Sequence, residues 1–153
     1  MEAIGLTASC LTIAGCAYTI IKDLRDLRAK YKQTDEVIDT LCVQVSTLRS
    51  AVYGLSSWME RRPLSAAKEK GLRLELRQSL DACGNLISAL QRHLTGVKGQ
   101  SENISARGKL RHILGEEELK EYNRMLSLQV QALSFLVQVI QLYVSHRLRI
   151  ATM

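Results

Sequence analysis

The chain begins with an uncharged, helix-forming segment, and this segment most limits what the protein can fold into. Residues 3–21, AIGLTASCLTIAGCAYTII, carry no charged side chain, and the densely charged stretch 22–32 follows without a helix breaker. A helix through both parts would be about 45 Å long, at about 1.5 Å per residue. The uncharged part is just long enough to cross a bilayer core of about 30 Å. The charged part is typical of an amphipathic helix in a bundle.

One side of this predicted helix carries apolar residues at steps of three and four. This seam predicts packing against other helices, and we expect contacts with the second, third and last helices of the chain. The seam consists of Leu6, Cys10, Ile13, Ala17, Ile20, Leu24, Leu27 and Tyr31.

The opposite side is not polar, although a simple soluble bundle would require polar residues there. It carries Ile4, Leu11, Gly15 and Tyr18. Two interpretations remain open. The helix is either a core helix, buried on all sides or with this face covered by a further neighbour, or it is a segment that leaves the protein and enters a membrane, with these four residues in contact with lipid.

The composition favours a single, mostly helical domain spanning residues 1–153. Proline occurs once, at Pro63, and only 5% of the residues are aromatic, which favours helices over sheets. The four cysteines lie at apolar helical positions without a C-x-x-C pair, so we interpret them as reduced core thiols of a cytosolic protein. Glu2 stands where a secretory signal would be positively charged.

Four further segments have helical patterns, which together predict an all-α bundle of four to five helices. The first helix is expected to end near Lys32, with Thr34 capping the second and Pro63 closing it. Thr95–Asn103 contains two glycines and no apolar period, which predicts a loop. The further predicted helices are a second between Thr34 and Pro63, whose apolar stripe runs from Val37 to Met59, a third from near Leu64–Ala67 to about Leu94, a short one at Ala106–Leu114, and Glu116 to about Arg147.

The last predicted helix has an unusual polar side that is uncharged. A solvated helix face normally carries Lys and Glu, so a neutral strip indicates contact with another protein surface. A shallow groove between neighbouring helices is an equally good interpretation. The predicted protein-interface residues are Gln131, Ser134, Gln138, Gln141 and Ser145.

Basic residues follow the uncharged segment, and the chain carries a net charge of +6. A basic collar beside an apolar segment suits an anionic membrane surface, although such charges are most often only solvated helix flanks. Nucleic acid is not expected as a partner, because exposed aromatics and a recognition motif are not evident. The predicted lipid-binding residues are Lys22, Arg25, Arg28, Lys30 and Lys32.

The sequence shows no pattern for catalysis, metal binding or a cofactor. His93, His112 and His146 lie at basic helix ends, where histidine commonly caps a helix. Gly108-Lys109 is followed by Leu110 and lacks the earlier glycine of a phosphate-binding loop. We therefore expect a protein that is not an enzyme and has no cofactor.

Two stretches resemble a known family of helical domains. The start MEAIGLTAS (residues 1–9) and the stretch GKLRHILGEEELK (residues 108–120), with the Leu-rich helix after it, resemble the HeLo-like N-terminal domain of fungal STAND (NLR-like) proteins. The resemblance covers nearly the whole chain. It implies a helical bundle that stands before a nucleotide-binding (NACHT or NB-ARC) or repeat domain in a longer protein.

The resemblance also implies a function in fungal immunity or heterokaryon incompatibility. Related domains are thought to form homo-oligomers and to attack the plasma membrane through their N-terminal helix, which by position is Ala3–Ile21 here. The expected function is a cytoplasmic cell-death effector or signalling domain that relocates to the plasma membrane, with anionic lipids as partners. The alternative is a soluble adaptor that contacts other proteins and never inserts.

Overall fold

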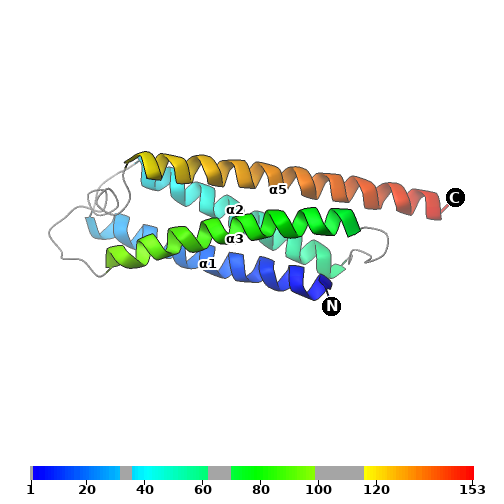
Figure 1. Cartoon of the computed structure of the whole chain (residues 1–153), viewed down its shortest axis with the longest axis horizontal. Coiled ribbons are helices and arrows are strands. Elements are labelled where there is room, and N and C mark those ends of the chain that lie inside the picture. The colour runs from blue at the N-terminus through cyan, green and yellow to red at the C-terminus, as the bar shows by residue number, and fades with distance from the viewer. Residues whose placement is uncertain (1, 32–35, 62–69, 99–115) are drawn as a thin grey trace.

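Four long α-helices and no strand make up the described part of the chain. In this computed structural model, residues 2–31, 36–61, 70–98 and 116–153 are described. Figure 1 shows the helices side by side along one long axis, so the predicted all-α bundle is confirmed. The predicted helix at residues 106–114, Thr34 and the expected start of the third helix lie outside the described residues. The helices are α1 (Glu2–Tyr31), α2 (Glu36–Arg61), α3 (Lys70–Lys98) and α5 (Glu116–Ala151).

Each helix has two principal neighbours, which gives the bundle a four-cornered cross-section. Helix α1 packs against α2 and α3, and α5 packs against the same two helices. The pairs α1 with α5 and α2 with α3 are therefore diagonal. Helices α1 and α3 run in one direction along the bundle, and α2 and α5 run in the other (Figure 1). The expected packing of α1 against α2 and α3 is confirmed, and the last helix, α5, is not one of the two principal neighbours of α1.

The predicted seams form the core. On α1 the described seam residues, from Leu6 to Leu24, are at most 5% exposed, because steps of three and four keep them on one side of the helix. On α2 the stripe begins at Ile38 and not at Val37, which is only half-buried. The largest fully buried side chains are Ile20, Leu24, Leu41, Leu48, Leu55, Leu76, Leu80, Ile87, Leu90 and Leu94.

Two helices end later than the sequence predicts. Helix α3 continues to Lys98, although Thr95–Lys98 was expected to begin a loop. The Thr95 Oγ1 hydroxyl donates to the Gln91 carbonyl oxygen at 2.9 Å, so the side chain is satisfied within the helix. Gly96 costs about 1 kcal/mol in a helix, which is too little to end one that is anchored by Leu94. Helix α5 continues to Ala151, and its C-terminal end extends beyond the other helices (Figure 1).

Candidate functional site

The outward side of α1 forms one stripe with an apolar half and a basic half. Leu11, Gly15, Tyr18, Lys22 and Arg25 follow steps of four and three, so they share one side of the helix, and all five are exposed. Leu11 is 47% exposed and Tyr18 is 57% exposed. We call these five residues the α1 outer face. The structure thus joins residues that were predicted separately for lipid contact and for anionic headgroups.

The other four residues predicted for this site lie partly or wholly outside the described part of the structure. Ile4, Arg28 and Lys30 lie within α1, but their side chains are outside the described part of the structure. Lys32 lies outside the described residues altogether.

Helix α2 adds a third cation beside the α1 outer face. The Arg49 guanidinium carbon lies 5.4 Å from the centre of the Tyr18 ring and 5.2 Å from that of Tyr53. These distances fit cation–π contacts, which position the Arg49 side chain between α1 and α2. Its buried Nε atom has no hydrogen-bond partner among the described residues. The sequence alone did not indicate Arg49, because it is one of several arginines at unremarkable spacing.

Arg49 lines a groove between α1 and α2 of ≈ 400 Å³. Three of the lining side chains are cations and one, Asp26, is an anion, so the groove has an excess of positive charge. A neighbouring groove of ≈ 690 Å³ shares Arg25, Ser46 and Ser50 with it and adds the carboxylate of Asp39, so the excess of positive charge lies in the first groove. This arrangement suits a small anionic group that accepts hydrogen bonds from arginine and serine. The first groove is lined by Tyr18, Ile21, Lys22, Arg25, Asp26, Ser46, Arg49 and Ser50.

A second basic cavity lies close to the start of α1. It measures ≈ 110 Å³ and is lined by Leu6 and Leu74 together with the three cations Lys70, Arg73 and Arg77 of α3. Positive charge therefore flanks the uncharged segment of α1 at both ends. Sequence reasoning missed this cluster because α3 is brought to α1 only by the fold.

The predicted interface strip of α5 is open to solvent. Gln131, Ser134, Gln138, Gln141 and Ser145 are all exposed, which argues against their lying in a groove between helices of the same bundle. Large apolar residues that the sequence analysis did not single out lie beside them. Leu128, Phe135 and Leu142 are 48%, 68% and 71% exposed. Their seven-residue spacing was the signal that could have found them.

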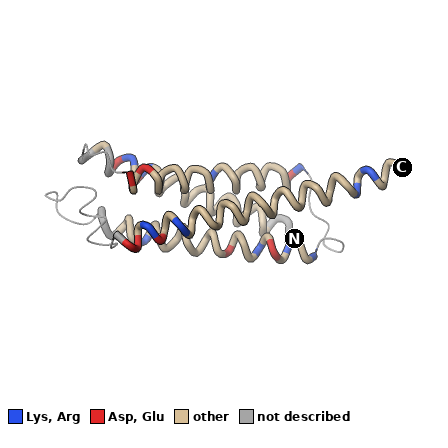
Figure 2. Tube along the Cα trace, turned by 90° about the horizontal axis from the view of Figure 1, so that it is seen from above, with Lys and Arg blue, Asp and Glu red and all other residues tan. Residues whose placement is uncertain are grey.

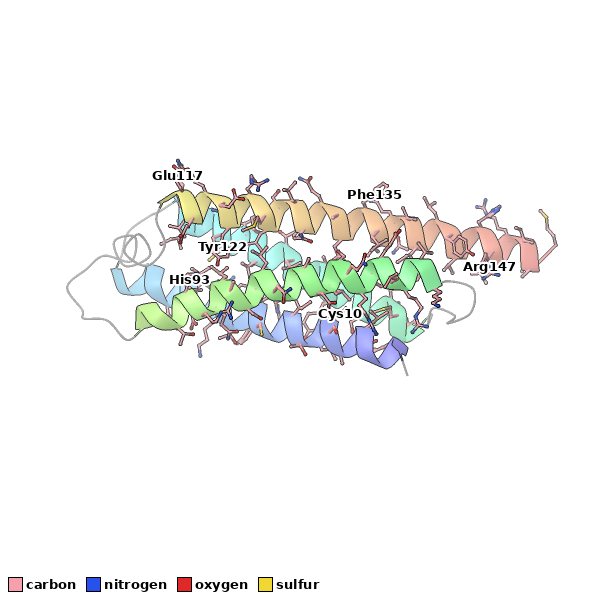
Figure 3. The ribbon with its side chains drawn as sticks, in the orientation of Figure 1. Cys10, His93, Glu117, Tyr122, Phe135 and Arg147 are labelled. Atoms are coloured by element: carbon pink, nitrogen blue, oxygen red, sulfur yellow. The ribbon has the colours of Figure 1, made fainter. Side chains whose placement is uncertain are left out.

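Two buried thiols, Cys10 of α1 and Cys83 of α3, lie close together in the core, and Cys83 also contacts α5. Burial raises the pKa of Cys10 to about 12 and that of Cys83 to about 11, with the neighbouring Cys83 adding to the effect on Cys10. Such thiols stay protonated near neutral pH and are poor nucleophiles. The Cys83 Sγ atom lies 3.9 Å from the Gln129 Oε1 atom of α5, as a weak donor to that amide. Figure 3 shows Cys10 between the ribbons of α1 and α3.

Histidine has a packing role in the described part of the bundle. The His93 ring of α3 meets the Tyr122 ring of α5 edge to face, with 5.9 Å between ring centres and 74° between ring planes (Figure 3). Burial and the charge of Glu118 raise the pKa of Tyr122, against the opposing effect of Arg92. Among the described residues, no three His, Cys, Asp or Glu side chains gather in a way that could hold a metal ion. His112 lies outside the described residues.

Two helices are long and apolar enough to cross a membrane, by length and composition alone. They are Gly5–Asp26, within α1, and Glu117–Ala151, within α5, and a core helix of a soluble protein can pass the same test. Of the most apolar window, 39% is buried in α1 and 17% in α5. Comparisons with protein-family models, curated proteins and solved structures found no match to the chain.

Proposed function

We propose that this protein is a non-catalytic signalling domain that acts on membranes through α1, in the manner implied by its resemblance to HeLo-like cell-death domains. One observation carries the proposal. The exposed stripe of α1 passes from an apolar half with Leu11 and Tyr18 to a basic half with Lys22 and Arg25. A cytoplasmic protein of this kind would relocate to the plasma membrane, whose inner leaflet is anionic.

The two halves of the α1 outer face would bind different layers of a membrane. Lys22, Arg25 and Arg49 would attract anionic headgroups, with about 1 kcal/mol for each cation near the surface. Tyr18 suits the interface, because its ring is apolar and its hydroxyl is polar. Leu11, two turns earlier, would reach the acyl boundary. This geometry supports binding with the bundle still folded.

Full insertion of α1 would require its core seam to leave α2 and α3. Residues such as Ile13 and Ile20 would exchange an apolar core for apolar lipid, so the transfer itself changes the free energy little. The cost lies in the cavity that remains between α2 and α3. Homo-oligomerisation at the membrane would offset this cost by covering the exposed core, which is the order of events that we propose.

The test is co-sedimentation of the purified chain with vesicles of phosphatidylcholine alone or mixed with phosphatidylserine, followed by dye release. Leu11→Glu should stay folded, since changes at exposed positions usually stay within about 0.5 kcal/mol. It should lose dye release and toxicity in fungal cells, because a charge costs about 3 kcal/mol at a bilayer centre. Phe135→Glu, which adds the same charge to α5, is the matched control and should still bind vesicles.

A second set of variants tests the basic half. Replacing Lys22, Arg25 and Arg49 by Gln should weaken binding to the anionic vesicles, and raising the salt concentration should weaken binding of the parent in the same way. Binding that is equal on neutral and anionic vesicles would contradict the proposed use of the groove.

A soluble adaptor is the second candidate function. It is favoured by the exposed neutral strip of α5, since amide and hydroxyl side chains suit hydrogen bonding to another protein. Failure of the parent chain to sediment with either kind of vesicle would replace the membrane proposal with this one. So would a Leu11→Glu variant that is folded and still toxic.

A further inference from the structure

The outer side of α5 carries a seam of the kind that pairs helices. Leu128, Ala132, Phe135, Val139 and Leu142 follow steps of 4, 3, 4 and 3 residues. This is the spacing of a coiled-coil seam. Figure 3 shows Phe135 projecting from α5 away from the other three helices. We call these five residues the outer seam.

The outer seam is distinct from the seam that α5 uses within the bundle. Leu126, Leu133 and Ile140 are at most 1% exposed and pack into the core. Phe135 follows Leu133 by two residues, which turns it about 200° around the helix and onto the opposite side. The described residues of the same chain leave the centre of the outer seam uncovered, because Phe135 is 68% exposed.

We propose that a second copy of this chain covers the outer seam, with the two α5 helices antiparallel and a two-fold axis at Phe135. The proposal deepens the adaptor function, on which it rests, because the outer seam lies beside the neutral strip of α5. It does not depend on membrane action by α1. A two-fold interface requires a surface that is complementary to itself. Leu128 and Leu142 are each seven residues from Phe135. In the antiparallel pair, Leu128 of one copy would therefore contact Leu142 of the other, and the two Phe135 side chains would contact each other.

Charge supports a second copy as the occupant. The chain carries a net charge of +6, so two copies repel each other least when the surfaces that meet carry no charge. Residues 125–145 contain no Asp, Glu, Lys or Arg, and Figure 2 shows this uncharged length of α5 between charged ends. Gln131 and Gln138 border the seam and can form hydrogen bonds across a protein interface. The same amides would be costly in lipid, which favours protein over membrane here.

The size of the surface sets the strength of the dimer. Residues 125–145 span about 30 Å, and a helix about 10 Å wide presents roughly 300 Å² in projection. A standard stable interface buries about 800 Å² on each partner. The dimer should therefore be weak and should form only as the concentration rises.

Sedimentation velocity of the full chain over a wide concentration range tests the pairing. The parent should pass from monomer to dimer, and Phe135→Glu should raise the dissociation constant at least about tenfold, because it places two like charges together on the axis. Val43→Glu is the matched control, since Val43 is a similarly exposed apolar residue on α2, at 62%. Circular dichroism checks that both variants keep the helicity of the parent.

Crosslinking tests the antiparallel order. Gln138→Cys and Ser145→Cys lie one heptad apart on the same side of α5, and both positions are exposed. In the antiparallel dimer, the two copies of residue 138 are about 9 Å apart along the axis and those of residue 145 about 30 Å apart. A short bismaleimide should therefore link only the first variant above the background of the parent. Equal linking of both variants would overturn the antiparallel arrangement.

The remaining outcomes are decisive as well. A parent that stays monomeric at every concentration overturns the proposal. So does a Phe135→Glu variant that dimerises as the parent does. A Phe135→Glu variant that loses vesicle binding while the parent is monomeric would assign the outer seam to lipid, whereas a vesicle defect confined to Leu11→Glu leaves the dimer proposal intact.

Discussion

Helices α1 and α5 look alike in sequence but differ in how much of their apolar surface the fold uses. Both contain a segment that is long and apolar enough to cross a membrane. In α1, 39% of the most apolar window is buried, and among its described side chains only Leu11 and Tyr18 are large, apolar and exposed. In α5 the buried share is 17%, and Phe135 and Leu142 are more than two-thirds exposed. Hydrophobic length therefore does not tell which helix is available to a partner.

The residues that border the α1 outer face and the α5 outer seam differ in charge, so we expect the two surfaces to bind different partners. The apolar half of the α1 outer face leads into Lys22 and Arg25, with Arg49 beside them. The α5 outer seam is bordered by Gln131 and Gln138, which are neutral. Cations attract anionic headgroups over a distance, whereas neutral amides need a partner with complementary hydrogen bonds. The first border suits a lipid surface and the second suits protein.

The largest expected effect separates the two sides of α1. Ile13 is 5% exposed on the core seam, so Ile13→Ala should lower the free energy of unfolding by roughly 2–5 kcal/mol. Leu11→Ala, on the outer face two residues away, should change it by less than about 0.5 kcal/mol. Urea unfolding followed by circular dichroism measures both values. Similar losses in the two variants would show that α1 is buried on all sides.

The next effect depends on pH and probes the core where α1, α3 and α5 meet. The thiols of Cys10 and Cys83 have pKa values of about 12 and about 11 in the folded chain, against 9.0 for an unperturbed thiol. Above pH 9 the unfolded chain loses these protons first and so binds fewer protons than the folded chain. The free energy of unfolding should therefore fall as the pH rises from 9 to 11, by up to about 1.4 kcal/mol per pH unit for each thiol.

The quantity to measure for these thiols is how steeply the melting temperature falls with pH, and not the stability at a single pH. Melting temperatures recorded in steps between pH 8 and 11 should fall less steeply for the Cys10→Ala, Cys83→Ala double variant than for the parent. An unchanged slope in the double variant would mean that other groups cause the alkaline loss.

The smallest effect concerns the end of α5 that extends beyond the bundle. Removing residues 148–153 should change the free energy of unfolding by less than about 0.5 kcal/mol, because Leu148 and Ile150 are 49% and 62% exposed. Ile140→Ala, at 1% exposed, is the contrast and should cost several times more. Thermal unfolding measures both changes. A large loss on truncation would show that the tip contributes to the fold.

The helices themselves followed from the sequence, because a core seam needs only a local period. Steps of three and four place residues on one side of a helix wherever that helix lies, so Leu6 to Leu24 could be assigned to the core in advance. The residue at which α3 ends could not be predicted in this way. Gly96 weakens a helix locally, but the neighbouring turn is anchored by Leu94 in the core, and this contact depends on the other helices.

The candidate sites could be predicted from the sequence less completely than the helices, because some of their residues come from different helices. The sequence by itself placed Leu11, Tyr18, Lys22 and Arg25 on the first helix, since one helix period contains them all. Only the packing of α2 on α1 brings Arg49 to Tyr18, and only the packing of α3 on α1 brings Arg73 and Arg77 beside Leu6.

Exposure of the α5 outer seam was also decided by the tertiary structure. A helix with apolar residues on two sides can be buried on both sides or on one, and its sequence alone does not tell which. Among the described helices, α2 and α3 are the principal neighbours of α5; Leu133 is buried and Phe135 is left exposed. Periodicity is a property of one helix, whereas exposure depends on how many neighbours the fold places around it.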